Sequence, residues 1–222
     1  MSDERVPTGA PELDHLLGGG LERRTITQFY GEPGSGKSTL CLIAVVSVLR
    51  SGMKVIFFDT EGFSVERFRQ LAGNEAEALA GNIYVFEPAD FDRQGLMIAE
   101  SERLLTKRDI GIIVMDSATA LYRTELGATR DAQRRLARQM IHVLGLAKKF
   151  NIPVLITNQV YVDVDTDEYR GLGGTALSHI SKVIVRVEKK DGVRRAVLVK
   201  HRSLPEGVFF DFEITANGIR GV

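Results

Sequence analysis

Gly31-Glu32-Pro33-Gly34-Ser35-Gly36-Lys37-Ser38 is an uninterrupted Gly-x-x-x-x-Gly-Lys-Ser motif, the pattern of a phosphate-binding loop. An apolar run over Thr25–Tyr30 precedes the motif, and a second apolar run over Thr39–Leu49 follows it. These runs predict a strand and a helix, which is the setting that a phosphate loop needs. Glycines let backbone amides face the phosphates, and the start of the helix adds its positive dipole end. The stretch therefore predicts a nucleoside triphosphate site.

The residue types of the loop predict separate roles in that site. We expect Lys37 to reach the β- and γ-phosphates and the Ser38 hydroxyl to hold Mg²⁺. The run Ile112–Asp116 is an apolar strand that ends in a carboxylate, and Asp116 is the expected second Mg²⁺ ligand. The predicted nucleotide contacts of the loop are Gly31, Glu32, Pro33, Gly34, Ser35, Gly36, Lys37, Ser38 and Thr39.

Strand-like and helix-like segments alternate along most of the chain, which predicts an α/β fold with a mostly parallel sheet flanked by helices. Several of the strand-like runs are continuously apolar, as expected for strands buried on both faces. The predicted strands are Thr25–Tyr30, Lys54–Asp59, Ile83–Phe86, Gly111–Asp116 and Val154–Thr157. The predicted helices are Pro11–Leu17, Lys37–Ser51, Ser64–Ala72, Arg93–Lys107 and Arg130–Phe150.

The pattern changes after Ser181. Short strand-like segments follow one another there, over 183–187, 195–200 and 208–214, with a hairpin signal at Lys190-Asp191-Gly192. We expect a C-terminal antiparallel extension of the same sheet. With no repeat or low-complexity linker, residues 1–222 are expected to form a single domain.

The composition excludes several classes of protein. The 222 residues carry a net charge of +0, so binding to nucleic acid would need a local basic patch. The single cysteine, Cys41, permits no disulfide within the chain and suits a reducing compartment. The polar and acidic start Met-Ser-Asp-Glu-Arg predicts no signal peptide, and no apolar run reaches the length of about 20 residues that a membrane span needs. A cytoplasmic protein is expected.

Two further strand ends carry polar side chains. Glu61, in Asp59-Thr60-Glu61-Gly62, is a candidate general base for the water that attacks the γ-phosphate. Its alternative is a carboxylate that caps a turn or helix. Gln159 could bond the γ-phosphate or that water and so report the nucleotide state to the next loop. Its alternative is an amide that pairs with backbone at the end of a strand.

In order and spacing, several motifs resemble the core of the RecA/RadA recombinase family. Besides the phosphate loop they are 16–21 (Leu-Leu-Gly-Gly-Gly-Leu), 59–62, 116–123 (Asp-Ser-Ala-Thr-Ala-Leu-Tyr-Arg), 156–160 (Ile-Thr-Asn-Gln-Val), and Gly173-Gly174 followed by His179. The resemblance covers essentially the whole chain. It implies a RecA-like P-loop ATPase core that binds ATP, Mg²⁺ and DNA.

The resemblance also implies roles for single residues. Glu61 is similar to the catalytic glutamate of the family, and Gln159 to the glutamine that couples ATP to the second DNA loop. Arg67 resembles the arginine that stacks on adenine in the family, although Arg67 lies one residue closer to Glu61 than the family spacing. The implied catalytic residues are thus Glu61, Lys37 and Gln159.

Departures from the family pattern shape the expected function. RadA-type recombinases have an N-terminal helix-hairpin-helix domain and an aromatic polymerisation plug, whereas about two dozen residues precede the first strand here. This is the pattern of a short archaeal RadA paralogue. It implies a weak ATPase that is an accessory factor in DNA repair and homologous recombination and does not itself exchange strands. The implied partners are single-stranded or branched DNA and recombination proteins such as a RadA recombinase or a junction nuclease, with a homo-oligomer also possible.

The DNA contacts are expected in the two loops after the Asp116 and Gln159 strands, at Arg123, Arg130 and Arg170. Four acidic residues in the second loop repel a phosphate backbone, so their neutralisation should strengthen DNA binding at low salt. They are Asp163, Asp165, Asp167 and Glu168. The basic segment 182–202 is a second candidate DNA surface, or else an edge strand protected by charge.

Two other functions remain open. A KaiC-like signalling ATPase shares the phosphate loop and the Gly-Gly-Gly-Leu lead-in, but paired glutamates would be expected where this chain has one, Glu61. An ATP-bound adaptor would act mainly through protein partners and would bind ATP without turnover.

Overall fold

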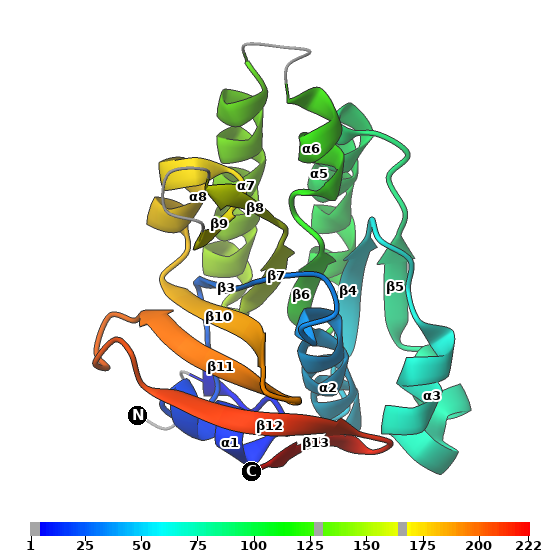
Figure 1. Cartoon of the computed structure of the whole chain (residues 1–222). Coiled ribbons are helices and arrows are strands. Elements are labelled where there is room, and N and C mark those ends of the chain that lie inside the picture. Colours follow the sequence, from blue (N-terminus) through cyan, green and yellow to red (C-terminus); the bar gives the residue numbers. More distant parts are fainter. Residues whose placement is uncertain (1–4, 127–130, 164–167) are drawn as a thin grey trace.

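The computed structural model describes residues 5–126, 131–163 and 168–222, and its centre is a nine-stranded sheet (Figure 1). The strand order is β13-β12-β11-β10-β3-β7-β6-β4-β5. These strands are β3 (Ile26–Tyr30), β4 (Lys54–Asp59), β5 (Ile83–Phe86), β6 (Ile110–Asp116), β7 (Val154–Asn158), β10 (Val183–Lys190), β11 (Val193–Lys200), β12 (Phe209–Thr215) and β13 (Gly218–Gly221). Two small two-stranded sheets pair β1 (Arg5–Val6) with β2 (Leu21–Glu22) and β8 (Val160–Asp163) with β9 (Glu168–Gly171).

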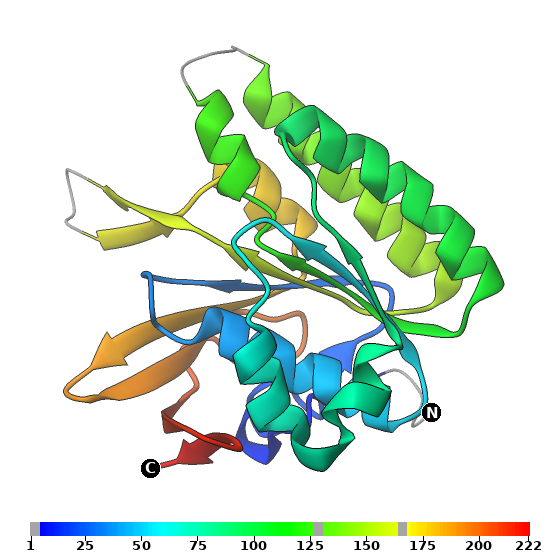
Figure 2. The ribbon, with the colours of Figure 1, turned by 90° about the vertical axis from the view of Figure 1, so that its right-hand side faces the viewer.

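Helices cover both faces of the parallel part of the sheet, as Figure 2 shows with α5 and α7 on one side and α2 and α3 on the other. The helices are α1 (Pro11–Leu16), α2 (Lys37–Arg50), α3 (Val65–Ala72), α4 (Ala76–Ala80), α5 (Phe91–Lys107), α6 (Ala120–Glu125), α7 (Ala132–Phe150) and α8 (Gly174–Ile180), with a 3₁₀ turn, η1, at Gly73–Glu75. In the described part of the chain, no helix is long and apolar enough to cross a bilayer.

The continuous apolar strands are explained by two hydrophobic cores, one on each face. Along β4, Val55 and Phe57 pack into the core of α1, α2 and α3, whereas Ile56 and Phe58 pack into the core of α5 and α7. Successive side chains of a strand point to opposite faces, so a strand buried on both faces must be apolar at every position. The five predicted parallel strands and the α/β fold class are confirmed.

The C-terminal antiparallel extension is also confirmed. β10 pairs parallel to β3, and β11, β12 and β13 then follow antiparallel, each beside the strand before it. The turn between β10 and β11 consists of Asp191 and Gly192, with φ of 45° and 87°. Two successive residues with positive φ suit the twist of a tight hairpin, and Asp-Gly is a favoured pair for it.

Several elements differ from the predicted set. The helix predicted at Arg93–Lys107 begins earlier, at Phe91, because the Asp90 carboxylate accepts a hydrogen bond from the Arg93 amide at 2.7 Å and caps it. The long helix begins at Ala132, and its predicted start at Arg130 lies outside the described residues. The β8–β9 hairpin and the short helices α4, α6 and α8 were not predicted, because segments of four to seven residues show too little periodicity.

The topology brings the polar strand ends together. β3, β7, β6 and β4 are parallel neighbours, and Tyr30 aligns with Asn158 as Asp59 aligns with Asp116. The segments that follow all four strands therefore start at one edge of the sheet. In open α/β sheets this edge is where ligands bind.

Candidate functional site

The phosphate loop lies between β3 and α2, as its motif predicted. Gly34 and Gly36 have φ of 74° and 108°, a region that L side chains avoid, and Gly36 is the residue from which α2 begins. The Lys37 Nζ donates to the carbonyl oxygens of Gly31 and Glu32 at 2.9 and 3.0 Å. Burial lowers the pKa of Lys37, and the nearby Glu61 and Asp116 carboxylates oppose that shift. The ammonium group is thus held over the loop.

Gly31 is the position of the loop that tolerates a side chain least. It has φ of 152°, and a Cβ built there would lie 1.8 Å from the Val187 carbonyl oxygen of β10. Gly31→Ala is therefore expected to destabilise the protein by about 2–4 kcal/mol, since the backbone must shift. Thermal unfolding tests this, with Gly52→Ala as the control: Gly52 has φ of 83° with nothing within 4 Å of the built Cβ. Equal losses of stability in both variants would show that the overlap with β10 is unimportant.

The two predicted Mg²⁺ ligands lie next to each other. Asp116 is 8% exposed, and its Oδ1 accepts a hydrogen bond from the Thr157 hydroxyl at 2.5 Å. Burial raises the pKa of Asp116, whereas hydrogen bonds from Thr157 and Ser38 act in the opposite direction. Among the described residues there is no group of three His, Cys, Asp or Glu side chains that could hold a metal ion. Ser38 and Asp116 fit Mg²⁺, because this ion usually takes one or two protein ligands together with phosphates and waters.

Asp116→Asn is expected to stabilise the nucleotide-free protein while weakening Mg²⁺-dependent ATP binding. The raised pKa of Asp116 means that the native state binds its proton more tightly than the unfolded chain does. The contribution of this carboxyl to stability therefore falls as the pH rises from its ordinary pKa through the raised one. We expect nucleotide-free Asp116→Asn to unfold at a higher Tm than wild type near pH 7, and the difference to shrink as the pH falls toward the ordinary pKa of the carboxyl. Thermal unfolding with and without Mg²⁺-ATP measures both effects, and a lower Tm in the free variant would contradict the account.

Glu61 and Gln159 come from separate strand ends and meet directly. The Gln159 Nε2 donates to the Glu61 Oε1 at 2.9 Å. Below them, the Asp59 carboxylate accepts hydrogen bonds from the amides of Glu61, Gly62 and Phe63 at 2.6–3.2 Å and so fixes the turn after β4. Glu61 itself is exposed. Asp59 therefore caps this turn, whereas the Glu61 carboxylate contacts the Gln159 side chain.

A chain of hydrogen bonds connects Gln159 with both loops that follow the sheet edge. The backbone amide of Gln159 donates to the hydroxyl of Thr119, just before α6, at 3.0 Å. The Gln159 carbonyl accepts from the Leu172 amide at 2.8 Å, just after β9. Asn158 contacts the same two residues, since it accepts from the Thr119 hydroxyl at 2.8 Å and donates to the Leu172 carbonyl at 2.9 Å. A shift of Gln159 would therefore be felt at the bases of both loops.

Arg67, the predicted adenine contact, is bound to the turn between β12 and β13. Its guanidinium donates to the carbonyl oxygens of Thr215, Ala216 and Gly218 at 2.8, 3.1 and 3.0 Å. Burial lowers the pKa of Arg67. These bonds fix its position relative to the C-terminal strands, and its stacking on adenine stays a prediction.

Of the predicted DNA contacts, Arg123 lies exposed on α6, and Arg170 lies exposed on β9. Arg130 lies outside the described residues, as do Asp165 and Asp167 of the acidic segment. Asp163 and Glu168 end β8 and begin β9. The structure thus places Arg123 and Arg170 on the two segments that follow the sheet edge.

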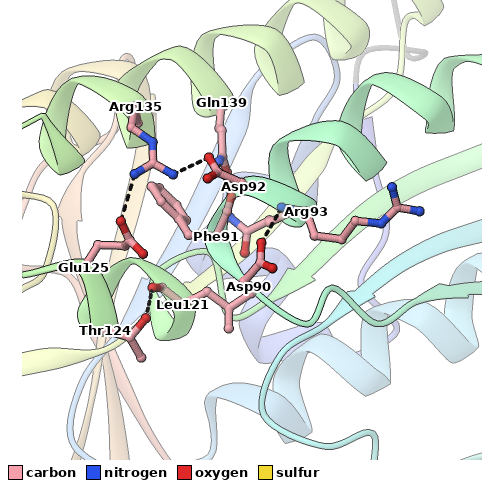
Figure 3. A network of polar contacts seen from close by, with 10 residues as sticks. Asp90, Phe91, Asp92, Arg93, Leu121, Thr124, Glu125, Arg135 and Gln139 are labelled. Carbon is pink, nitrogen blue, oxygen red and sulfur yellow. Dashed lines mark hydrogen bonds and ion pairs between the residues drawn. The ribbon is translucent and has the colours of Figure 1, made fainter. Parts of the chain in front are cut away.

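Helix α6 is held in place by a network of polar contacts around Arg135 of α7 (Figure 3). The guanidinium donates to the Glu125 carboxylate at 2.8 Å, bonds to Asp92 of α5, and lies 5.1 Å from the centre of the Phe91 ring. Gln139 donates to the Phe91 carbonyl at 2.8 Å. One arginine thereby ties the end of α6 to both long helices, which orients the surface that bears Arg123.

Several residues of the site were not assigned a role from the sequence. Thr157 bonds Asp116, and Thr119 bonds both Asn158 and Gln159. Their signal is weak, because a hydroxyl residue at a strand end has many uses. Tyr161 and Tyr169 of the β8–β9 hairpin are 47% and 48% exposed. Two exposed aromatic side chains in a short polar segment were a usable signal for a binding surface.

The phosphate loop, the carboxylate at the end of β6 and the strand order together define a P-loop nucleotide-binding protein with a RecA-like fold. Residues 4–222 match the Rad51 family model, and the chain belongs to the Rad51 family. Membership of this family places the protein among DNA repair and recombination proteins. Proteins of the Rad51/RecA-like family bind ATP with Mg²⁺.

Named relatives agree with this family. The chain is 62% identical to the DNA repair and recombination protein RadB of Methanoculleus marisnigri, covering 100% of both chains. It is 44% identical to RadB of Methanococcoides burtonii, covering 98% of both. A crystal structure of a RadB recombinase superposes with a TM-score of 0.83 at 39% identity, covering 98% of this chain and 99% of the other. The predicted likeness to a short archaeal RadA paralogue is confirmed.

Proposed function

We propose that the protein is an ATP-controlled accessory factor of archaeal DNA recombination. It binds ATP with Mg²⁺, hydrolyses it slowly, and binds single-stranded or branched DNA in the cytoplasm. The observation on which this rests most is the hydrogen bond between Gln159 and Glu61. It connects the proposed general base with the proposed nucleotide sensor, whose backbone leads to both DNA-facing segments.

The nucleotide part of the proposal is supported by the fit of the loop to a polyphosphate. The positive φ at Gly34 and Gly36 suits amides turned toward an anion, and Lys37 already lies over the loop carbonyls. Bound Mg²⁺ would neutralise charge that develops on the phosphates. Ser38 and Asp116 would hold that ion, and Glu61 would take a proton from the attacking water.

Coupling between ATP and DNA follows from the position of Gln159. A γ-phosphate or its attacking water that bonds the side-chain amide of Gln159 would compete with the Glu61 carboxylate for that amide. Any resulting shift passes through Thr119 to α6 and through Leu172 to the β8–β9 hairpin. Both segments are short and lie at the surface, so a small displacement at their bases changes what they present to DNA.

The surface beside the hairpin supports a single-stranded ligand. A cavity of about 670 Å³ lies between the β8–β9 hairpin, α8 and β10, and its lining includes Tyr161, Tyr169, Arg170 and Arg186. Proteins that bind single strands combine basic grooves with aromatic rings on which bases stack. We expect Arg130 to add a phosphate contact, and the acidic residues of the hairpin to keep the affinity below that of a strand-exchanging recombinase.

Protein partners complete the proposal. A recombination factor with modest DNA affinity would act beside a RadA recombinase or a junction nuclease, and core-to-core contacts between copies would give a homo-oligomer. The alternative of an ATP-bound adaptor predicts ATP binding without any effect on DNA. The signalling ATPase is disfavoured by membership of the Rad51 family.

Arg123→Gln tests the DNA surface. Each lost phosphate contact lowers the slope of log affinity against log salt by about 0.7 for single strands. We expect weaker binding of a fluorescent single-stranded oligonucleotide, by about 3- to 10-fold at low salt, and a shallower salt dependence. Arg69→Gln, an exposed arginine of α3 on the other side of the sheet, is the control. Identical salt slopes in wild type and Arg123→Gln would remove α6 from the proposed DNA surface.

A further inference from the structure

The β10–β11 hairpin lies directly against the phosphate loop. The Lys189 amide donates to the Glu32 carboxylate at 3.1 Å, and the Val187 carbonyl occupies the space beside Gly31. The hairpin therefore forms a second wall next to the proposed nucleotide site. The two walls come from segments about 150 residues apart in the chain.

Two basic side chains of this wall extend over the glycines of the loop. The Lys189 Nζ lies 3.2 Å from the position that a Cβ of Gly34 would take. The Arg194 Cδ and Nε lie 3.3 and 3.7 Å from the corresponding position at Gly36. A side chain at either glycine would displace one of these cations.

The two cations differ in how they are satisfied. Lys189 has an acidic neighbour, the Glu32 carboxylate, at 4.0 Å from its Nζ. The Arg194 Nε is buried and has no hydrogen-bond acceptor within the described ranges. The adjacent Arg195, in contrast, binds the Asp211 carboxylate with two hydrogen bonds of 2.6 and 2.7 Å. A buried charged donor without an acceptor is costly, and beside the phosphate loop an anionic ligand would supply the missing acceptor.

We propose that Arg194 binds the polyphosphate of the nucleotide from the hairpin side, with Lys189 adding positive charge. This inference rests on the proposed ATP binding. The planar guanidinium suits phosphate oxygens, to which it can donate two hydrogen bonds at once. The nucleotide is then bound between the phosphate loop and the β10–β11 hairpin of the same chain. Because it contacts both, its binding stabilises the packing of the C-terminal strands against the loop.

The test is an equilibrium titration of mant-ATP, in Mg²⁺, on wild type, Arg194→Gln and Arg194→Lys. Lys190→Gln is the matched control, because Lys190 is an exposed cation on the same hairpin that is not among the atoms nearest to either glycine. We expect Arg194→Gln to weaken mant-ATP binding by about 10- to 100-fold, since a hydrogen bond to a charged group is lost. Arg194→Lys should lose less, and Lys190→Gln should stay within about twofold.

Thermal unfolding provides a readout that does not depend on turnover. Without nucleotide, all three variants should unfold near the wild-type temperature, which shows that they fold. At an ATP concentration that saturates wild type, ATP should raise the Tm of Arg194→Gln less than that of wild type, because stabilisation by a ligand follows its affinity. If Arg194→Gln were poorly folded, the comparison of Arg194→Lys with wild type would decide the question by the same two measurements.

The outcomes separate the inference from the proposed function. If wild type binds mant-ATP and Arg194→Gln binds it equally well, the inference is wrong while the nucleotide site stands. If Arg194→Gln keeps its mant-ATP affinity but loses affinity for a single-stranded oligonucleotide, Arg194 belongs to a DNA surface and the inference is again wrong. If wild type itself does not bind mant-ATP, the proposed function fails and the inference fails with it.

Discussion

Replacing Glu61 by glutamine is expected to lower ATP turnover by about 10²- to 10⁴-fold, the range that a positioned general base contributes. ATP affinity should change little, because the glutamine amide has nearly the shape of the carboxylate and the contacts to the phosphates come from other residues. Turnover should be measured under single-turnover conditions with labelled ATP, since the rate of the wild type is itself expected to be low.

The control is Glu66→Gln, which removes an exposed carboxylate at the start of α3, close to Glu61 in the sequence. This variant should hydrolyse ATP at the wild-type rate. A Glu61→Gln protein that hydrolyses ATP as fast as wild type would show that another group activates the water, and the assignment of Glu61 would be wrong.

Lys37→Ala is expected to weaken ATP binding by at least about 100-fold. The substitution removes a cation that bonds the phosphates directly, and hydrogen bonds to charged groups contribute about 1.5–3 kcal/mol each. In the nucleotide-free protein the loss of stability should be small, because burial disfavours the charged Lys37 ammonium and offsets part of what its two hydrogen bonds to loop carbonyls contribute.

Isothermal titration of Mg²⁺-ATP checks this prediction, with Lys107→Ala as control, an exposed lysine at the end of α5. Thermal unfolding of the free variant distinguishes lost binding from lost folding. Near-normal ATP affinity in Lys37→Ala would contradict the assignment of the 31–38 segment as the phosphate loop.

The fold was predictable from the sequence because its dominant forces are local and periodic. Continuous apolar runs such as Ile112–Met115 can be satisfied only by burial on both faces, which requires helices on both sides of a parallel sheet. The Asp191-Gly192 hairpin was equally predictable, since few residue pairs adopt two positive φ angles at low cost.

Contacts between distant segments were not predictable in the same way. Gln159 and Glu61 were each identified by their position at a strand end, but their mutual hydrogen bond depends on the order of β7, β6 and β4 in the sheet. The approach of Arg194 to Gly36 depends on how the C-terminal strands curl back over the loop. Sequence spacing sets neither of these distances, because many sheet topologies are compatible with the same succession of strands.

The contact between the Arg67 guanidinium and the β12–β13 turn was likewise not predictable from the sequence. The resemblance to the recombinase family implied that Arg67 stacks on adenine. What fixes the side chain is a set of backbone carbonyls about 150 positions later, which no local pattern encodes. Adenine recognition by Arg67 would use a guanidinium that the fold has already oriented.

The most direct test of the account is the affinity of a fluorescent single-stranded oligonucleotide measured with and without Mg²⁺-ATP, for wild type and Gln159→Ala. We expect the oligonucleotide affinity of wild type to shift several-fold when Mg²⁺-ATP is added. Gln159→Ala should bind ATP normally but show no such shift, since the side-chain contact that connects Glu61 with Thr119 and Leu172 is lost. An oligonucleotide affinity that is the same with and without ATP in wild type would contradict nucleotide control of DNA binding.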